Sequence, residues 1–315
     1  MLYKSGYNLE EGAIDFISNN DSITLFSAYI KLEELKKINV KKNIKQIIVR
    51  WEIEDLCKGV SDIDLYQYCI DNGIVLYRNT RLHMKAFWNN QDSIVFGSAN
   101  VTGRGLGEVG NYNFELNGLI ESINIEDIIY LNKVIASSEY VSKELYEELN
   151  DIVSNTSLPT LIFPDLPTIR KELDWFLLSQ LPMSKSPDDF YEVAIHSEDF
   201  EFLEQNCAAH DVAIFDIDPF QEYSLFKLKL KDKFNSHPFI IALKEHIKTQ
   251  PSLSLRYGGV VEWIQKNTTT VPTPRSWELK QEQIVNILYT WICEFDEKFT
   301  WDIPGRYSEV IRYNI

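Results

Sequence analysis

The pattern of hydrophobic and polar positions divides the first half of the chain into short strands and amphipathic helices. Apolar or alternating runs predict strands, and runs with a period near 3.6 predict helices. The expected strands are Ser22–Tyr29, Gln46–Trp51, Ile74–Tyr77, Leu82–Trp88, Ser93–Phe96 and a strand running from Glu115 to Ile120. The expected helices are Ala13–Ser18, Leu32–Ile38, Asp62–Asn72, Ile125–Ser137 and Val141–Ser154. Strands separated by helices indicate an α/β fold, with a mixed sheet flanked by helices.

The pattern changes after residue 155, where a linker is expected over 156–167. Pro159, Pro164 and Pro167 keep this stretch from folding as a helix. From 168 to 315 a smaller, mostly helical α+β domain is expected. Its expected helices are Ile169–Leu181, Pro238–Lys248, Tyr257–Gln265 and Lys280–Phe295, with a loop at Pro182–Asp189 and short strands at Val193–Ile195 and Val212–Phe215. We therefore expect two domains, 1–155 and 168–315.

One predicted hairpin in the first domain carries the candidate chemistry. Side chains alternate along a strand, so within Leu82–Trp88 the side chains of His83 and Lys85 point the same way, roughly 7 Å apart. A polar turn follows, and the second strand ends in Gly-Ser-Ala-Asn, where Ser98 and Asn100 also lie two residues apart. A tight hairpin lays the two pairs side by side. An imidazole, an ammonium, a hydroxyl and a carboxamide on one surface suit a tetrahedral phosphate.

This pattern resembles the HKD motif of the phospholipase D superfamily, which is His-x-Lys followed by Gly-Ser-x-Asn. The matching residues are His83, Lys85, Gly97, Ser98 and Asn100. The chain departs at Asn90, where the family usually has Asp; that Asp mostly supports the site structurally, so the resemblance still implies the chemistry. Family members often carry a Glu at the start of the next strand that orients the histidine. Glu115 fits this position, and Glu108 is the alternative.

The resemblance implies phosphodiester hydrolysis without a metal or another cofactor. One histidine attacks phosphorus and becomes a phosphohistidine, while a second protonates the leaving oxygen and then activates water. The family builds this site from two motif copies, and this chain has one full copy. We therefore expect a homodimer in which His83 of each subunit meets the other across a twofold axis. Lys85, Ser98 and Asn100 would bind phosphate oxygens, and Glu115 would fix the imidazole tautomer.

Other features of the sequence are candidates for substrate contact. Arg104 adjoins a glycine-rich loop spelling Gly-x-Gly-x-x-Gly, which lacks the flanking elements of a dinucleotide site and is expected beside the active site. Lys227, Lys229, Lys231 and Lys233 alternate with apolar residues, so a strand there would carry four lysines on one face. Such a face suits phosphates, and the alternative is an edge strand made soluble by its lysines.

Two further patterns favour structural roles. A second His-x-Lys, His246-Ile247-Lys248, lies in a helical run without a Gly-Ser-x-Asn after it. The carboxylate pair Asp216 and Asp218 lacks partner ligands, so a loop turn is expected there rather than a metal site.

Composition narrows the class of protein. The 315 residues are 44% hydrophobic, and the net charge of -16 opposes nonspecific binding to nucleic acid, which excludes a basic coat protein. The start of the chain has no signal-peptide core, and no apolar run approaches a membrane span. Four cysteines without metal spacing are expected to be reduced. We therefore expect a cytoplasmic protein that does not bind membranes.

Three functions remain open on this reasoning. The first is a DNA endonuclease, similar to metal-independent restriction enzymes and active in restriction or antiphage defence. The second is a phospholipase or another phosphodiesterase. The third is a catalytically degenerate subunit that works beside a helicase, an ATPase or another defence partner.

Overall fold

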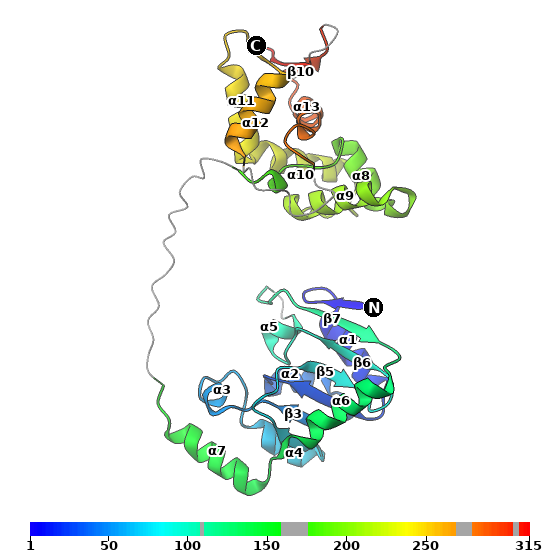
Figure 1. Ribbon diagram of the computed structural model, residues 1–315, viewed down its shortest axis with the longest axis vertical. Helices are drawn as coiled ribbons and strands as arrows, with labels where there is room; N and C mark the ends of the chain where they lie inside the picture. The colour runs from blue at the N-terminus through cyan, green and yellow to red at the C-terminus, as the bar shows by residue number, and fades with distance from the viewer. Residues whose placement is uncertain (108–109, 159–175, 269–278, 305–308) are drawn as a thin grey trace. The chain divides into compact units, whose positions relative to one another are not determined.

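The chain divides into two compact units, Met1–Phe163 and Pro164–Ile315, and each has a hydrophobic core of its own (Figure 1). The structure, a computed structural model, describes residues 1–107, 110–158, 176–268, 279–304 and 309–315. Within these residues no helix has both the length and the apolar character needed to cross a membrane.

The first unit alternates strands and helices, as the hydrophobic pattern predicts. Its strands are β1 (Leu2–Lys4), β2 (Ile23–Ser27), β3 (Ile44–Val49), β4 (Val75–Arg78), β5 (Lys85–Trp88), β6 (Ile94–Gly97), β7 (Leu116–Ile120) and β8 (Glu139–Tyr140). Its helices are α1 (Leu9–Ser18), α2 (Leu32–Ile38), α3 (Ile53–Cys57), α4 (Leu65–Asn72), α5 (Gly103–Leu106), α6 (Ile125–Ala136) and α7 (Lys143–Asn155). The short elements β1, α3, α5 and β8 are additions that the sequence pattern does not indicate.

The strands of this unit form one mixed sheet. Its order among the described residues is β1-β7-β6-β5-β2-β3-β4-β8. The β2, β3 and β4 strands run parallel, and β5, β6 and β7 are antiparallel to their neighbours. Every residue of β2 is buried, because the strand lies between β3 and β5 with helices on both faces. The expected α/β fold with a mixed sheet flanked by helices is confirmed.

Each face of the sheet has its own core. Leu25, Phe87 and Val95, which pair across β2, β5 and β6, belong to the larger core with residues of α1 to α5 and α7. Phe26 and Trp88 point to the other face and pack under α6 (Figure 1). Gly73 ends α4 in the left-handed conformation, with φ 66°, as expected for a glycine after a helix.

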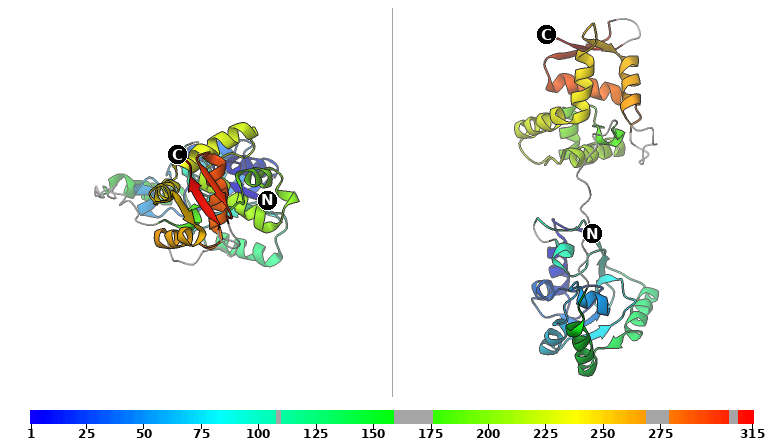
Figure 2. Two further views of the ribbon diagram at one scale, coloured as in Figure 1. Left: turned by 90° about the horizontal axis from the view of Figure 1, so that it is seen from above. Right: turned by 90° about the vertical axis from the view of Figure 1, so that its left-hand side faces the viewer.

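The second unit is mostly helical, with one small sheet. Its helices are α8 (Pro187–Ile195), α9 (Phe202–Phe215), α10 (Tyr223–Ser236), α11 (Pro238–Lys248), α12 (Tyr257–Asn267) and α13 (Ile284–Phe295), with 3₁₀ turns at Leu178–Gln180 and Ser197–Asp199. Its strands are β9 (Ser254–Arg256), β10 (Phe299–Asp302) and β11 (Val310–Tyr313), which pair antiparallel in the order β10-β11-β9. Figure 2 shows this sheet beside α13. The Trp291 indole lies in the core and donates to the Ser184 carbonyl at 3.0 Å.

Several local predictions for the second unit are wrong. The stretches expected as strands at Val193–Ile195 and Val212–Phe215 are the ends of α8 and α9. The loop expected at Pro182–Asp189 ends sooner, although the Ser-Pro-Asp signal expected within it does start a helix: Ser186 is the N-cap of α8 and Pro187 opens it. The helix expected at Ile169–Leu181 lies partly outside the described residues, and its described end is a 3₁₀ turn. The segment 159–167 of the expected linker also lies outside them.

The lysine-bearing strand is also wrong, because this stretch is helix α10. Phe226 and Leu230 are fully buried, whereas Leu228 is 58% exposed, so the apolar period is four residues and not two. Helical geometry puts Lys227 and Lys231 on one side of α10 and Lys229 and Lys233 on another. Lys227 pairs with Asp188 and Glu294, Lys229 donates to Gln221, and Lys233 donates to the Asp216 carbonyl. The single lysine face predicted for phosphate binding is therefore not formed.

Candidate active site

The motif lies at one edge of the first unit's sheet. Because β5 and β6 pair antiparallel with Phe87 opposite Val95, the residues before β5 and after β6 come to the same edge. The predicted hairpin is thus present, but its first strand begins at Lys85 and not at Leu82. His83 lies in the preceding loop and is exposed. The two side chains are therefore not held at strand spacing.

A hydrogen bond links the loop to the strand instead. The Lys85 ammonium donates to the backbone carbonyl of His83 at 2.7 Å. The loop itself is shaped by Asn79, whose side-chain oxygen accepts from the Arg81 amide at 3.1 Å and whose carbonyl accepts from Leu82. The imidazole is left at the surface, while the backbone of the same residue binds a buried cation.

Ser98 and Asn100 both have their acceptor atoms occupied by the scaffold. The Ser98 hydroxyl accepts from the Leu116 amide at 3.1 Å. The Asn100 side-chain oxygen accepts from the Tyr29 amide at 3.2 Å and from the Ser27 hydroxyl at 3.4 Å. A backbone N–H only donates, so the amide oxygen of Asn100 must face Tyr29. Among the described contacts, the Ser98 hydroxyl hydrogen and the Asn100 amide hydrogens are then free to donate to a phosphate.

Lys85 is a nearly buried cation, with 9% of the residue exposed. Burial lowers its pKa, the Glu115 carboxylate raises it again, and the Arg50 guanidinium lowers it further. These effects place Lys85, Glu115 and Arg50 within one electrostatic environment. A buried ammonium is weakly solvated, and it therefore attracts an incoming phosphate more strongly than a surface lysine does.

Asn90 stands where the resembling family has Asp, and it supports the hairpin. It lies in the turn at the far end of β5 from His83, in the left-handed conformation with φ 62°. Its side-chain oxygen accepts from the Thr24 hydroxyl at 2.6 Å, and its nitrogen donates to the carbonyl and hydroxyl of Ser22 at 3.1 Å. Asn90 therefore ties the β5–β6 turn to β2.

The remaining predicted residues are placed less directly. Glu115 precedes β7 and accepts from the Asn113 side chain at 3.3 Å, and no hydrogen bond to His83 is present among the described residues. Its role in fixing the imidazole tautomer stays a prediction. Glu108 lies outside the described residues. Arg104 lies on α5, a single helical turn after the Asn100 loop, with its side chain exposed.

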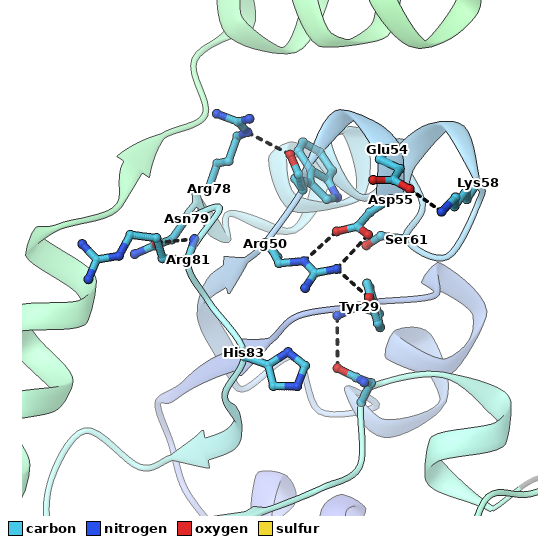
Figure 3. A network of polar contacts seen from close by, with 12 residues as sticks. Tyr29, Arg50, Glu54, Asp55, Lys58, Ser61, Arg78, Asn79, Arg81 and His83 are labelled. Atoms are coloured by element: carbon cyan, nitrogen blue, oxygen red, sulfur yellow. Dashed lines mark hydrogen bonds and ion pairs between the residues drawn. The ribbon is translucent and has the colours of Figure 1, made fainter. Parts of the chain in front are cut away.

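Sequence reasoning missed a polar cluster at the same edge, formed by Tyr29, Arg50 and Asp55 (Figure 3). Arg50 follows β3, and its Nε and Nη2 donate to the two Asp55 carboxylate oxygens at 2.7 and 2.8 Å. Nη2 also donates to the Tyr29 hydroxyl at 2.5 Å. The signal that could have found this cluster is an arginine at the carboxyl end of a buried parallel strand, where ligands bind in such sheets.

Two cavities adjoin the motif. One, of about 610 Å³, is lined by His83 and by two exposed cations, Arg81 and Lys133, beside Tyr130. The other, of about 400 Å³, reaches Lys85 and is mainly apolar, with Phe96 in its wall. The exposed imidazole thus has open space next to it. No group of three or more His, Cys, Asp or Glu side chains suited to a metal ion occurs within the described part of the chain.

Comparisons with known proteins give likenesses of fold. No protein-family model and no curated protein matches the chain. The phospholipase D family member Nuc from Salmonella typhimurium is 13% identical over 45% of this chain and 99% of its own, with a TM-score of 0.36. NucT from Helicobacter pylori is 17% identical over 45% and 98%, with a TM-score of 0.34. Phosphatidylserine synthase from Haemophilus influenzae is 17% identical over 49% and 43%, with a TM-score of 0.32.

The motif residues of the first unit flank one hairpin, as the sequence pattern predicts. His83 and Lys85 precede and begin one strand, and Ser98 and Asn100 follow its hairpin partner. A mixed sheet flanked by helices brings these four side chains to one edge.

Replacing Gly97 with alanine is expected to destabilise the first unit by about 3 kcal/mol, because β7 leaves no room for a methyl group. A Cβ at Gly97 would lie 2.3 Å from the Leu116 carbonyl oxygen and 2.6 Å from the Asn117 Cα. Gly118→Ala is the matched control on the paired strand, since its Cβ would meet nothing closer than 3.8 Å. Calorimetric unfolding of both variants measures the difference, and equal stabilities would contradict this packing.

Glu115→Gln is expected to move the alkaline limb of the pH–rate profile for diester hydrolysis to lower pH. In the phosphodiester hydrolysis that the motif implies, Lys85 would bind phosphate oxygens only with its proton, so the rate is expected to fall as pH rises through its pKa, which burial already lowers. Removing the Glu115 charge removes the influence that raises this pKa. The value of kcat/KM for a chromogenic diester, measured between about pH 7 and 11, reports the shift. Glu121→Gln, just after β7, serves as the control. An alkaline limb that stays in place or moves to higher pH in Glu115→Gln would contradict the electrostatic effect of Glu115 on Lys85.

Proposed function

We propose that this chain is a metal-independent phosphodiester hydrolase that cleaves DNA as a homodimer through a phosphohistidine. The observation that carries the proposal is the arrangement around His83. An exposed imidazole lies at an open cavity, and the same edge of the sheet carries the nearly buried Lys85 ammonium and two neutral groups whose donor hydrogens are unoccupied among the described contacts. This combination suits attack on phosphorus without a metal ion.

The proposed reaction proceeds in two steps. In the first, the imidazole of one subunit attacks phosphorus, the P–O bond to the leaving group breaks, and the second imidazole gives that oxygen its proton. In the second, the same second imidazole takes a proton from water, whose oxygen attacks phosphorus and releases the first histidine. Lys85 and the donors of Ser98 and Asn100 would bind the non-bridging oxygens throughout.

Two subunits are proposed because one chain offers one suitable histidine of the His-x-Lys type among the described residues. The second copy is occupied by structural contacts in α11: the His246 ring stacks on Trp263 with centroids 5.7 Å apart, and Lys248 pairs with Glu245 at 2.7 Å. No Gly-Ser-x-Asn follows this second copy in the sequence. The second histidine of the reaction is therefore assigned to His83 of another copy.

DNA is the proposed substrate because the cavity at His83 has cations and an exposed ring. Arg81 and Lys133 can neutralise phosphates that flank the reacting one, and Tyr130 is 59% exposed, as a base-stacking side chain must be. The local charge thus opposes the overall acidity of the chain. Restriction or antiphage defence remains the proposed setting, in which the second unit, with its separate core, would contact the recognition sequence or a helicase-like partner.

Hydrolysis of a phospholipid is the second candidate, and the apolar cavity that reaches Lys85 favours it. Met84, Phe96 and Ile120 line this cavity, and Phe96 is 46% exposed. Such a surface suits an acyl chain or another apolar group next to the phosphate.

The deciding experiment is plasmid nicking by purified protein in excess EDTA, run beside hydrolysis of phosphatidylcholine vesicles. Wild type and His246→Ala should nick the plasmid equally, and His83→Ala should not. Vesicle hydrolysis without nicking would assign the second candidate. Failure of wild-type protein on both substrates and on a chromogenic diester would point to the degenerate, partner-dependent subunit.

A further inference from the structure

Arg50 is a cation of the site that the motif does not include. It follows β3, which pairs with β2, and β2 pairs with β5 through Ser27 and Lys85. Two strand spacings therefore separate the Arg50 and Lys85 backbones, about 10 Å. Both side chains are long enough to approach one phosphate from two sides. Figure 3 shows the Arg50 guanidinium on the side of the cluster that faces the His83 imidazole.

The guanidinium is held rigidly. Asp55 binds it in a bidentate pair, the Tyr29 hydroxyl accepts from Nη2, and its carbon lies 4.8 Å from the centre of the Tyr29 ring. The Arg50 and Asp55 side chains are only 18% and 9% exposed. The hydrogen bond to Asp55 raises the pKa of Arg50, so the group stays charged at any pH of interest. Little conformational entropy remains to be lost when a ligand binds.

One edge of this guanidinium is unused. Among the described residues, Nη1 has no hydrogen-bond partner, whereas Nε and Nη2 carry all the contacts. Asp55 and Tyr29 thus hold Nε and Nη2, and the Nη1 hydrogens are left to bind a ligand. Arg78, at the end of the neighbouring β4, differs: its Nε donates to the Trp51 carbonyl at 2.9 Å, and its Nη1 pairs with Glu139 at 3.3 Å.

Tyr29 connects this cluster to the motif. Its backbone N–H holds the Asn100 side-chain oxygen, and its hydroxyl holds Arg50. The pairing of Val49 with Ser27 and of Ser27 with Lys85 brings the two cations to the same edge of the sheet, and the Arg50 charge accordingly lowers the pKa of Lys85. Two positive groups held close together without a ligand repel, and a phosphate between them removes that repulsion.

We propose that Arg50 is a further phosphate-binding residue of this site and contacts the non-bridging oxygens of the reacting phosphoryl group. Tyr29 and Asp55 act as its positioning residues. The inference rests on the proposed hydrolase function and adds a fixed donor, Nη1 of Arg50, to the flexible Lys85 ammonium. Because the contact strengthens as charge builds on phosphorus, its loss should lower kcat more than it raises KM.

The test uses bis(p-nitrophenyl) phosphate, a small diester that has no flanking phosphate. Arg50→Gln is expected to lower kcat about 100-fold, and Arg50→Lys about 10-fold, because a lysine keeps the charge but loses the fork by which Asp55 and Tyr29 hold the cation in place. Arg78→Gln is the matched control and should stay within about twofold of wild type. Arg50→Gln should also move the alkaline limb of the profile upward, since Arg50 lowers the pKa of Lys85.

A second measurement separates this inference from the proposed function. Calorimetry with inorganic phosphate should show binding to wild type and to Arg78→Gln, and binding at least about 10-fold weaker to Arg50→Gln. If wild type lacks hydrolytic activity but this difference is found, the hydrolase proposal fails and the role of Arg50 stands. Two outcomes overturn the role of Arg50: phosphate binding that is absent from wild type or equal in Arg50→Gln, or diester hydrolysis by Arg50→Gln within twofold of wild type. If Arg50→Gln lost cleavage of DNA but kept hydrolysis of the small diester, Arg50 would bind a flanking phosphate, and its proposed contact with the reacting phosphoryl group would also be wrong.

Discussion

Replacing His83 with alanine is expected to lower kcat for phosphodiester cleavage by about 10⁴-fold or more, because the side chain serves as both nucleophile and proton carrier in the proposed dimer. The fold should not change. The imidazole is exposed and has no hydrogen bond to another described residue, so stability should remain within about 0.5 kcal/mol of wild type. Single-turnover rates and calorimetric unfolding measure the two quantities on the same preparation.

Mixed dimers sharpen this result. If both histidines of the reaction come from His83 of two subunits, a dimer of one wild-type and one His83→Ala chain is inactive. Equal amounts of the two chains, unfolded and refolded together, then retain about a quarter of the wild-type activity by random pairing. Retention of half would mean that each chain works alone and would contradict the shared site. Refolded wild type and refolded His246→Ala set the recovery expected from refolding itself.

The sequence predicts most of the first unit because its elements follow local rules. Leu32–Ile38 is a helix at the expected bounds, and Gly73 ends α4 through its left-handed conformation. The hairpin follows from two apolar runs with a polar turn between them. The candidate site is found the same way, since His83, Lys85, Ser98 and Asn100 flank that one hairpin.

What the sequence does not predict depends on contacts between distant segments or on an ambiguous period. Arg50 joins the site only because β3 pairs with β2, and Tyr29 joins it only through the loop after β2. His83 lies before the strand because the Asn79 turn delays the start of β5 to Lys85. In α10, alternation over a few residues resembles the pattern of a strand. Phe226, Leu230 and Phe234 are buried at four-residue spacing, which is the period of a helix.

Replacing Asp211 with alanine is expected to destabilise the second unit by about 3 to 5 kcal/mol, the largest stability effect of any single change considered. The carboxylate is fully buried and accepts from the Met183 amide at 2.9 Å and the Ser184 amide at 2.8 Å. It also faces Nδ1 of the buried His210 ring at 2.8 Å, whose Nε2 lies 2.8 Å from the Ser179 carbonyl. Its removal leaves buried donors without an acceptor.

Two control variants distinguish the loss of this buried hydrogen-bond network from the loss of a negative charge. Asp232→Ala removes a carboxylate from the exposed side of α10 and should change stability by less than about 0.5 kcal/mol. Asp211→Asn keeps one oxygen for the two amides but turns its NH₂ group toward the His210 ring. Its loss of stability should therefore fall between those of Asp232→Ala and Asp211→Ala. Calorimetric unfolding orders the three variants. A cost below about 1 kcal/mol for Asp211→Ala would show that water replaces the carboxylate, and that the segment from Ser179 to Ser184 does not depend on Asp211 for its position.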